Sequence, residues 1–105
     1  MNEHFKKVLD SLVKNLSNES KGLLITLFQE KNELKKETLR DLTNHNYLTK
    51  FPDRPALIPS RFVLDIHCAR LEGAGLVEVR HSGRTRYYKI TEQGKLLLTY
   101  IQNNK

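Results

Sequence analysis

The strongest constraint on the fold comes from residues 59–91, where the spacing of apolar residues changes once, from helical to alternating. A helix is predicted over residues 59–73, because Pro59 and Ser60 are typical of a helix start and Gly73 and Gly75 of a helix end. Alternation of apolar and polar residues then predicts two strands separated by Ser82 and Gly83. A long helix followed by a β-hairpin over about residues 76–91 is therefore expected.

Four more helices are expected around this unit. Apolar residues recur at spacings of three and four over about residues 4–16 and 19–30, and a closing helix is predicted over 91–103. A short helix over 37–45 carries Thr38 and Asp41 at the spacing of a capping box. Residues 46–57 contain two prolines and are interpreted as a loop, and a brief strand is possible within the connection 31–36. The predicted fold class is mainly α with a small β-hairpin (α+β), in one domain spanning residues 1–105.

Composition excludes several classes of protein. The 105 residues are 38% hydrophobic and 29% charged, which is typical of a globular chain. No apolar run approaches the ~20 residues of a membrane span, and the start lacks the apolar block of a secretory signal, so we expect a cytoplasmic protein without membrane contact. The single cysteine, Cys68, forbids an internal disulfide and leaves too few soft ligands for a structural zinc site.

An enzyme is not expected. The four histidines fall in separate elements, and His67 and Cys68 are adjacent on a helix, so their side chains diverge by ~100° and are poorly placed to bind one metal. The glycines mark a helix end and a turn rather than a phosphate-binding loop. We therefore predict no catalytic residue, no metal and no cofactor.

The order of elements is that of a winged helix-turn-helix with an added N-terminal helix and a C-terminal helix. In this fold the helix over 59–73 would enter a DNA major groove, and the hairpin tip, His81 to Arg86, would lie beside it as the wing. The formal charge of +6 favours a polyanionic partner. Arg80, Arg84, Arg86 and Lys89 fall close together with no acid between them, which indicates phosphate contacts or, alternatively, only a solvated hairpin surface.

Two segments resemble winged-helix regulators of the MarR and ArsR type. Leu71 to Val77 matches their "Leu-Glu-x-x-Gly-Leu-Val" end of the recognition helix. Gly83 to Gly94 is similar to their wing and its "Tyr-x-Ile-Thr-x-x-Gly" return into the last helix. The resemblance implies binding of double-stranded DNA and a role as a transcriptional repressor. A minority of such domains bind protein or RNA instead, and a protein-binding adaptor is a further alternative.

The chain departs from these regulators in the turn before the recognition helix. Residues 46–57 make this turn longer than the family needs, so we interpret it as an insertion loop. The loop carries Lys50 and Arg54 near where a phosphate could lie, although an inert surface loop fits equally well.

The recognition helix itself is the second departure. At ~100° per residue, Leu64, Cys68 and Leu71 share the face that should join the core. The residues expected to bind DNA are those with polar or charged groups at the helix start, further along it and in the wing, together with the two loop cations: Ser60, Arg61, Asp65, Arg70, Arg84, Thr85, Arg86, Lys50 and Arg54.

The outer face of the same helix is apolar and carries Phe62, Ile66 and Ala69. Either this face packs under the insertion loop, or two copies of the chain meet there and present paired helix starts to DNA.

The second arrangement resembles the TubR family, the centromere-binding winged-helix adaptors of tubulin-type plasmid partition systems. That resemblance implies a homodimer, a tubulin-like GTPase as partner protein, and repression of its own operon. The competing dimer interface consists of Phe5 to Leu16 with Leu96 to Ile101, as in MarR-like repressors.

Overall fold

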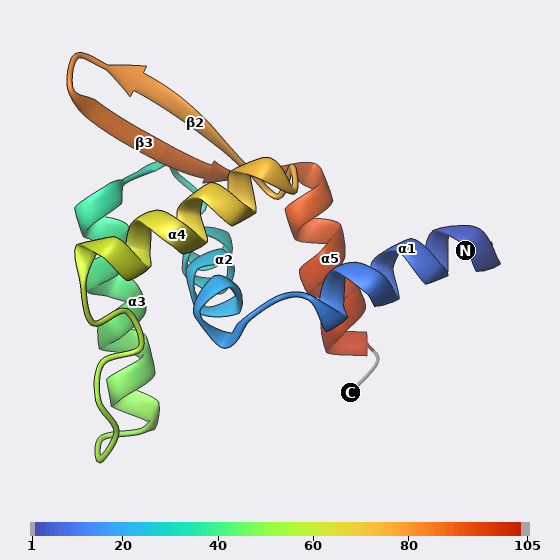
Figure 1. Ribbon diagram of the computed structural model, residues 1–105, viewed down its shortest axis with the longest axis horizontal. Coiled ribbons are helices and arrows are strands. Elements are labelled where there is room, and N and C mark those ends of the chain that lie inside the picture. The colour runs from blue at the N-terminus through green and yellow to red at the C-terminus, as the bar shows by residue number, and fades with distance from the viewer. Residues whose placement is uncertain (1, 104–105) are drawn as a thin grey trace.

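The computed structural model describes residues 2–103 and confirms the predicted fold class. Five helices and a small antiparallel sheet form a winged helix-turn-helix with an extra helix at each end (Figure 1). The elements, in chain order, are α1 Glu3–Lys14, α2 Asn18–Glu30, β1 Leu34–Lys35, α3 Lys36–Lys50, α4 Arg61–Gly73, β2 Val77–Ser82, β3 Thr85–Ile90 and α5 Glu92–Asn103.

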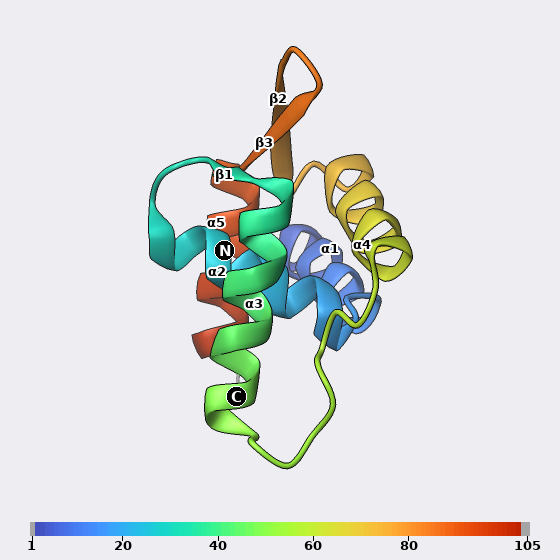
Figure 2. The same cartoon turned by 90° about the vertical axis from the view of Figure 1, so that its left-hand side faces the viewer.

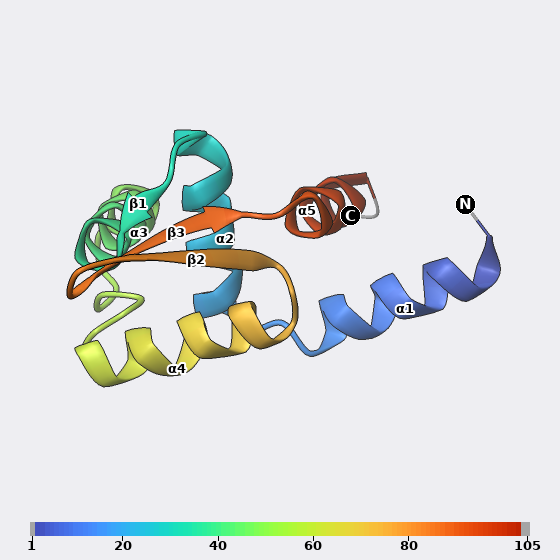
Figure 3. The same cartoon turned by 90° about the horizontal axis from the view of Figure 1, so that it is seen from above.

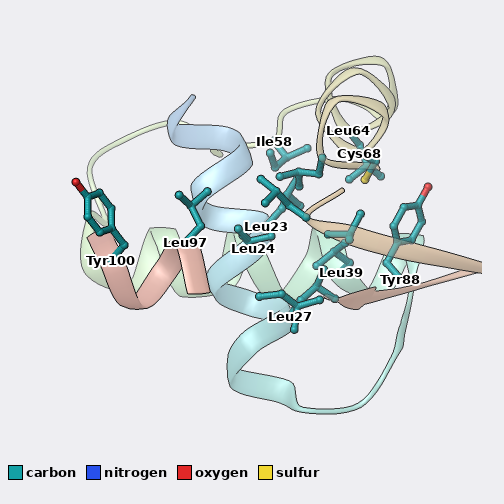
Figure 4. Close-up of a cluster of buried hydrophobic side chains, with 14 of the residues drawn as sticks. Leu23, Leu24, Leu27, Leu39, Ile58, Leu64, Cys68, Tyr88, Leu97 and Tyr100 are labelled. Carbon is teal, nitrogen blue, oxygen red and sulfur yellow. The ribbon is translucent and has the colours of Figure 1, made fainter. Parts of the chain in front are cut away.

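The core forms around α2, which packs against α3, α4 and α5. Leu23, Leu24 and Leu27 are fully buried because the helical period places them toward these neighbours. Figure 4 shows them surrounded by Leu39 of α3, Leu64 and Cys68 of α4, Tyr88 of β3 and Leu97 of α5. Burial of Leu64, Cys68 and Leu71 confirms the predicted inward face of α4.

The sheet has the strand order β1-β3-β2, and all pairs are antiparallel. Leu34 pairs with Tyr88, so β1 joins the hairpin to the start of α3. The hairpin closes where Ser82 pairs with Thr85, and Gly83 between them has a φ of 61°, which strongly favours glycine. The hairpin rises beside α4 as the wing (Figure 2).

The ends of α4 follow the signals in the sequence. The Ser60 hydroxyl accepts a hydrogen bond from the Val63 amide at 3.2 Å and caps the helix, which begins at Arg61. At the other end, the Leu76 amide donates to the Leu71 carbonyl and Gly75 has a φ of 74°. This is the left-handed glycine end that the sequence predicts.

The two terminal helices pack on each other at one side of the molecule. Tyr100 of α5 donates a hydrogen bond to the Asp10 carboxylate of α1. Figure 3 shows the N-terminal half of α1 projecting beyond the rest of the fold. Phe5 and Val8 of α1 and Leu96 of α5 remain substantially exposed.

The prediction for the third helix was wrong in length. Instead of residues 37–45, α3 covers Lys36–Lys50, so the first part of the predicted loop 46–57 is helical. Proline cannot continue a helix and disfavours helical backbone in the residue before it, so Pro52 stops the helix at Phe51, not at Asn46. The predicted capping box is also absent, because the cap is Lys35, whose side chain makes no capping hydrogen bond. The other predicted helices agree with the structure apart from a residue or two at their ends.

Candidate nucleic-acid interface

Three segments far apart in the sequence meet in one basic cleft. The cleft lies between the start of α3, the first turns of α4 and the wing, and has a volume of about 510 Å³. Its lining residues are Lys35, Lys36, Glu37, Arg61, Asp65, Arg84, Thr85 and Arg86. Five cations therefore face two carboxylates, and the positive end of the α4 dipole adds to the potential.

The two carboxylates are each paired with a cation across the floor of the cleft. Asp65 binds the Lys36 ammonium, and this hydrogen bond lowers the pKa of the Asp65 carboxyl from its usual value. The guanidinium of Arg61 lies 3.8 Å from Glu37 Oε1 and is mostly exposed. Within residues 2–103, neither Arg84 nor Arg86 forms an ion pair, although Arg86 lies near Tyr88 and Asp65 and favours the charged form of both side chains.

The cleft unites five of the predicted DNA-binding residues: Arg61, Asp65, Arg84, Thr85 and Arg86. Ser60 stands at the same end of α4, where its hydroxyl is used as the helix cap. Arg70 lies in the last turn of α4, beside Leu12 and Leu16, and is not part of the cleft.

The loop cations do not join the cleft either. α3 begins at the cleft with Lys36 and ends at Lys50, and its 15 residues give a length of about 22 Å. Arg54 packs over the Phe51 ring at 4.2 Å, beyond the end of α3. The cleft geometry therefore gives no support to phosphate contacts by Lys50 and Arg54, which stay a prediction.

The apolar outer face of α4 is open to solvent. Phe62 is 73% exposed, Ala69 is exposed and Ile66 is partly buried. The interpretation that this face packs under the insertion loop is wrong for Phe62, because the loop is anchored elsewhere. Asn44 of α3 holds it through two hydrogen bonds to the Ile58 backbone, at 2.8 and 3.0 Å.

Sequence reasoning missed several roles that depend on long-range contacts. Lys35 and Lys36 line the cleft, although they are not among the residues predicted from the sequence to bind DNA. The one sequence feature that could have indicated this role is their position at the start of a helix. Arg80, part of the basic cluster in the sequence, forms a bidentate ion pair with Glu33, in which Nη2 donates to Oε1 at 2.5 Å and Nε to Oε2 at 3.1 Å, and it stacks on Tyr87. It braces the wing instead of facing the cleft.

His67 and Cys68 have side chains that could take part in catalysis or metal binding, but both are buried. His67 is buried, and its Nδ1 lies 3.2 Å from the hydroxyls of both Ser17 and Ser20. Burial raises the pKa of the Cys68 thiol to about 11, so it behaves as a small apolar group.

Across residues 2–103, no group of three histidine, cysteine or acidic side chains is arranged to hold a metal. None of the described helices is long and apolar enough to cross a membrane.

The fold and the cleft define a winged-helix protein with one basic face, built from the starts of α3 and α4 and from the wing. No model of a known protein family matches the chain. The DNA-binding protein TubR of Bacillus cereus (strain ATCC 10987 / NRS 248) is 34% identical to it in an alignment 102 positions long, and the alignment covers 91% of this chain and 84% of the relative. The chain therefore belongs to the TubR family, as the sequence resemblance suggested.

Proposed function

We propose that the protein binds double-stranded DNA sequence-specifically through the basic cleft. The observation that carries the proposal is the convergence of five cations from three segments on one face. Its membership of a family whose Bacillus cereus relative is named a DNA-binding protein supports the same conclusion. Phosphates bind such a face because each contact releases condensed counterions.

Roles within the cleft follow from position and pairing. Arg84 and Arg86 at the wing tip contact phosphate or the minor groove, with Thr85 beside them. Arg61 in the first turn of α4 reads a base edge in the major groove, because an arginine there can pair with guanine through two hydrogen bonds. Ser60 fixes the start of the helix, and Asp65 orients Lys36.

We propose further that the DNA-binding unit is a homodimer joined through the outer face of α4. Phe62, Ile66 and Ala69 form an apolar surface that a two-fold axis can make self-complementary. Burial of this surface brings two α4 starts together, so the helix starts and the wings, rather than whole helices, meet the DNA.

The biological role that fits this family is that of a centromere-binding adaptor in plasmid partition. In that role the DNA-bound protein joins a tubulin-like GTPase to the plasmid, and by occupying DNA beside its own gene it also represses its operon. A MarR-like repressor is the second candidate. The exposed Phe5, Val8 and Leu96 favour it, because they offer terminal helices as a different dimer interface.

A footprint on DNA flanking the gene separates these functions. A tandem array of protected repeats supports the partition adaptor, whereas one protected palindrome supports the repressor. Absence of any protected site, together with salt-independent behaviour of a random duplex in a gel, would contradict DNA binding altogether.

A further inference from the structure

A second concave surface lies at the other end of α3 from the basic cleft. This groove, of about 500 Å³, is bounded by α2, by the last turns of α3 and by the insertion loop. α3 descends from the wing to this loop (Figure 1), and the groove lies along its second half, from Thr43 to Lys50, whereas the cleft lies at its start.

The walls of the groove are fixed by close contacts. A Cβ atom on Gly22 would lie 2.7 Å from Leu57 Cδ2, so the loop side chain Leu57 packs directly on α2 and would have to shift if a larger residue stood at position 22. Beneath it, the Thr43 hydroxyl donates to Thr26 Oγ1 at 2.9 Å, and Thr26 donates to the Gly22 carbonyl. A surface held in place before binding loses less entropy when a ligand arrives.

The chemistry of the lining is apolar at the floor and cationic at the rim. Ile25 is 43% exposed, and Leu57 and Phe51 are partly buried. The cations are Lys21, Lys50 and Arg54, and no carboxylate is among the described residues that line the groove.

Arg54 is positioned as a recognition group. Its guanidinium lies over the Phe51 ring at 4.2 Å, and its Nη1 donates to the Tyr47 hydroxyl at 3.3 Å. The Lys50 ammonium lies 5.7 Å from the centre of the same ring. Two cations, Lys50 and Arg54, are therefore held around one aromatic side chain. A guanidinium has five N–H donors on three nitrogens, and the hydrogen bond from Arg54 to Tyr47 uses only one of these nitrogens.

We infer that the groove binds an acidic peptide segment of another protein, with a large apolar side chain on the floor and carboxylates at the rim. A protein ligand fits better than nucleic acid, because Ile25 and Leu57 form an apolar floor that suits a large apolar side chain better than the highly charged sugar-phosphate backbone. The size of the groove suits one or two side chains. This inference is independent of DNA binding and explains the insertion loop, which the proposed DNA contacts leave unused.

The test selects short random peptides displayed on phage against the full-length protein. We expect the selected peptides to combine Asp or Glu with at least one aromatic or long aliphatic residue. Their affinity, measured by fluorescence anisotropy, should fall at least tenfold in Lys50→Glu/Arg54→Glu and weaken with added salt. The matched control, Lys6→Glu/Lys7→Glu on the exposed face of α1, changes net charge equally and should bind the peptides as the wild type does.

A second variant keeps the test decisive if the loop variant does not fold. Ile25→Glu adds a carboxylate at the exposed floor without touching the loop and should also reduce peptide binding at least tenfold. The inference is overturned if no acidic peptides are enriched, or if the control variant loses as much affinity as the groove variants. It is also overturned if the loop variant leaves peptide binding intact and weakens only duplex DNA, since the groove would then serve nucleic acid.

Discussion

Replacement of Phe62 by alanine should separate folding of the chain from its dimerisation. The side chain is 73% exposed, so only about a quarter of it packs within one protomer. With ~200 Å² for a phenylalanine side chain and ~25 cal/mol per Å², the part buried within one protomer contributes ~1.4 kcal/mol to folding. The exposed part, if buried in the dimer, corresponds to ~3.6 kcal/mol per protomer, or ~7 kcal/mol for both copies.

Only a fraction of that free energy becomes affinity, because association orders side chains and removes water from polar groups. One third of the ~7 kcal/mol still weakens the dimer roughly 50-fold, since ~1.4 kcal/mol is a tenfold change in the dissociation constant. Phe62→Ala should therefore give a folded protein that is monomeric at concentrations where the wild type is dimeric.

Sedimentation velocity over a range of concentrations measures this directly, with thermal unfolding as the check on folding. The matched control is Phe28→Ala on α2, where the phenylalanine is 45% exposed and lies outside the proposed interface. Ile66→Asp should act as Phe62→Ala does, because it places a charge opposite its own copy. A wild-type dimer constant in both α4 variants refutes the α4 interface, and monomers of Val8→Asp would then place it on the terminal helices.

Three further outcomes follow from the cleft and the core. Arg61→Ala should cost about 1 to 3 kcal/mol on the specific site and little on a random duplex in competition gel shifts; an equal loss on both makes Arg61 a phosphate contact. Asp65→Asn releases Lys36 and should raise affinity for random duplex several-fold while reducing discrimination, and unchanged affinity contradicts the role given to this ion pair. The pKa of Cys68 is about 11 in the folded protein and ~8.5 for an unfolded thiol. The contribution of Cys68 to the free energy of unfolding should therefore decline as the pH rises from ~8.5 to about 11. Rapid labelling of the thiol in the native protein at pH 8 would contradict its burial.

Local sequence signals predicted the elements whose conformation is decided within a few residues. The end of α4 and the turn of the wing need left-handed backbone, and the glycines at positions 75 and 83 are where it occurs. The buried face of α4 also follows from spacing alone, because a helix repeats at a fixed angle and Leu64, Cys68 and Leu71 must share a side.

Features set by contacts between distant residues could not be predicted in this way. Arg80 looks like a DNA contact in the sequence, yet Glu33 pairs with it only because β1 joins the sheet. Lys36 belongs to the cleft because the start of α4 lies beside the start of α3, where Asp65 pairs with Lys36. The predicted third helix was too short because the prediction began the loop at Asn46, six residues before Pro52, whereas the helix continues to Lys50.

The most direct test of the account is the salt dependence of duplex binding by Arg84→Ala/Arg86→Ala. Each lost phosphate contact should reduce the slope of log affinity against log salt by ~0.9, so the double variant should bind specific and random duplexes less tightly, with a slope smaller by ~1.8. Lys6→Ala/Lys7→Ala on α1 should leave the slope at the wild-type value. An unchanged slope in the wing variant would contradict the assignment of the basic cleft as the DNA-binding surface.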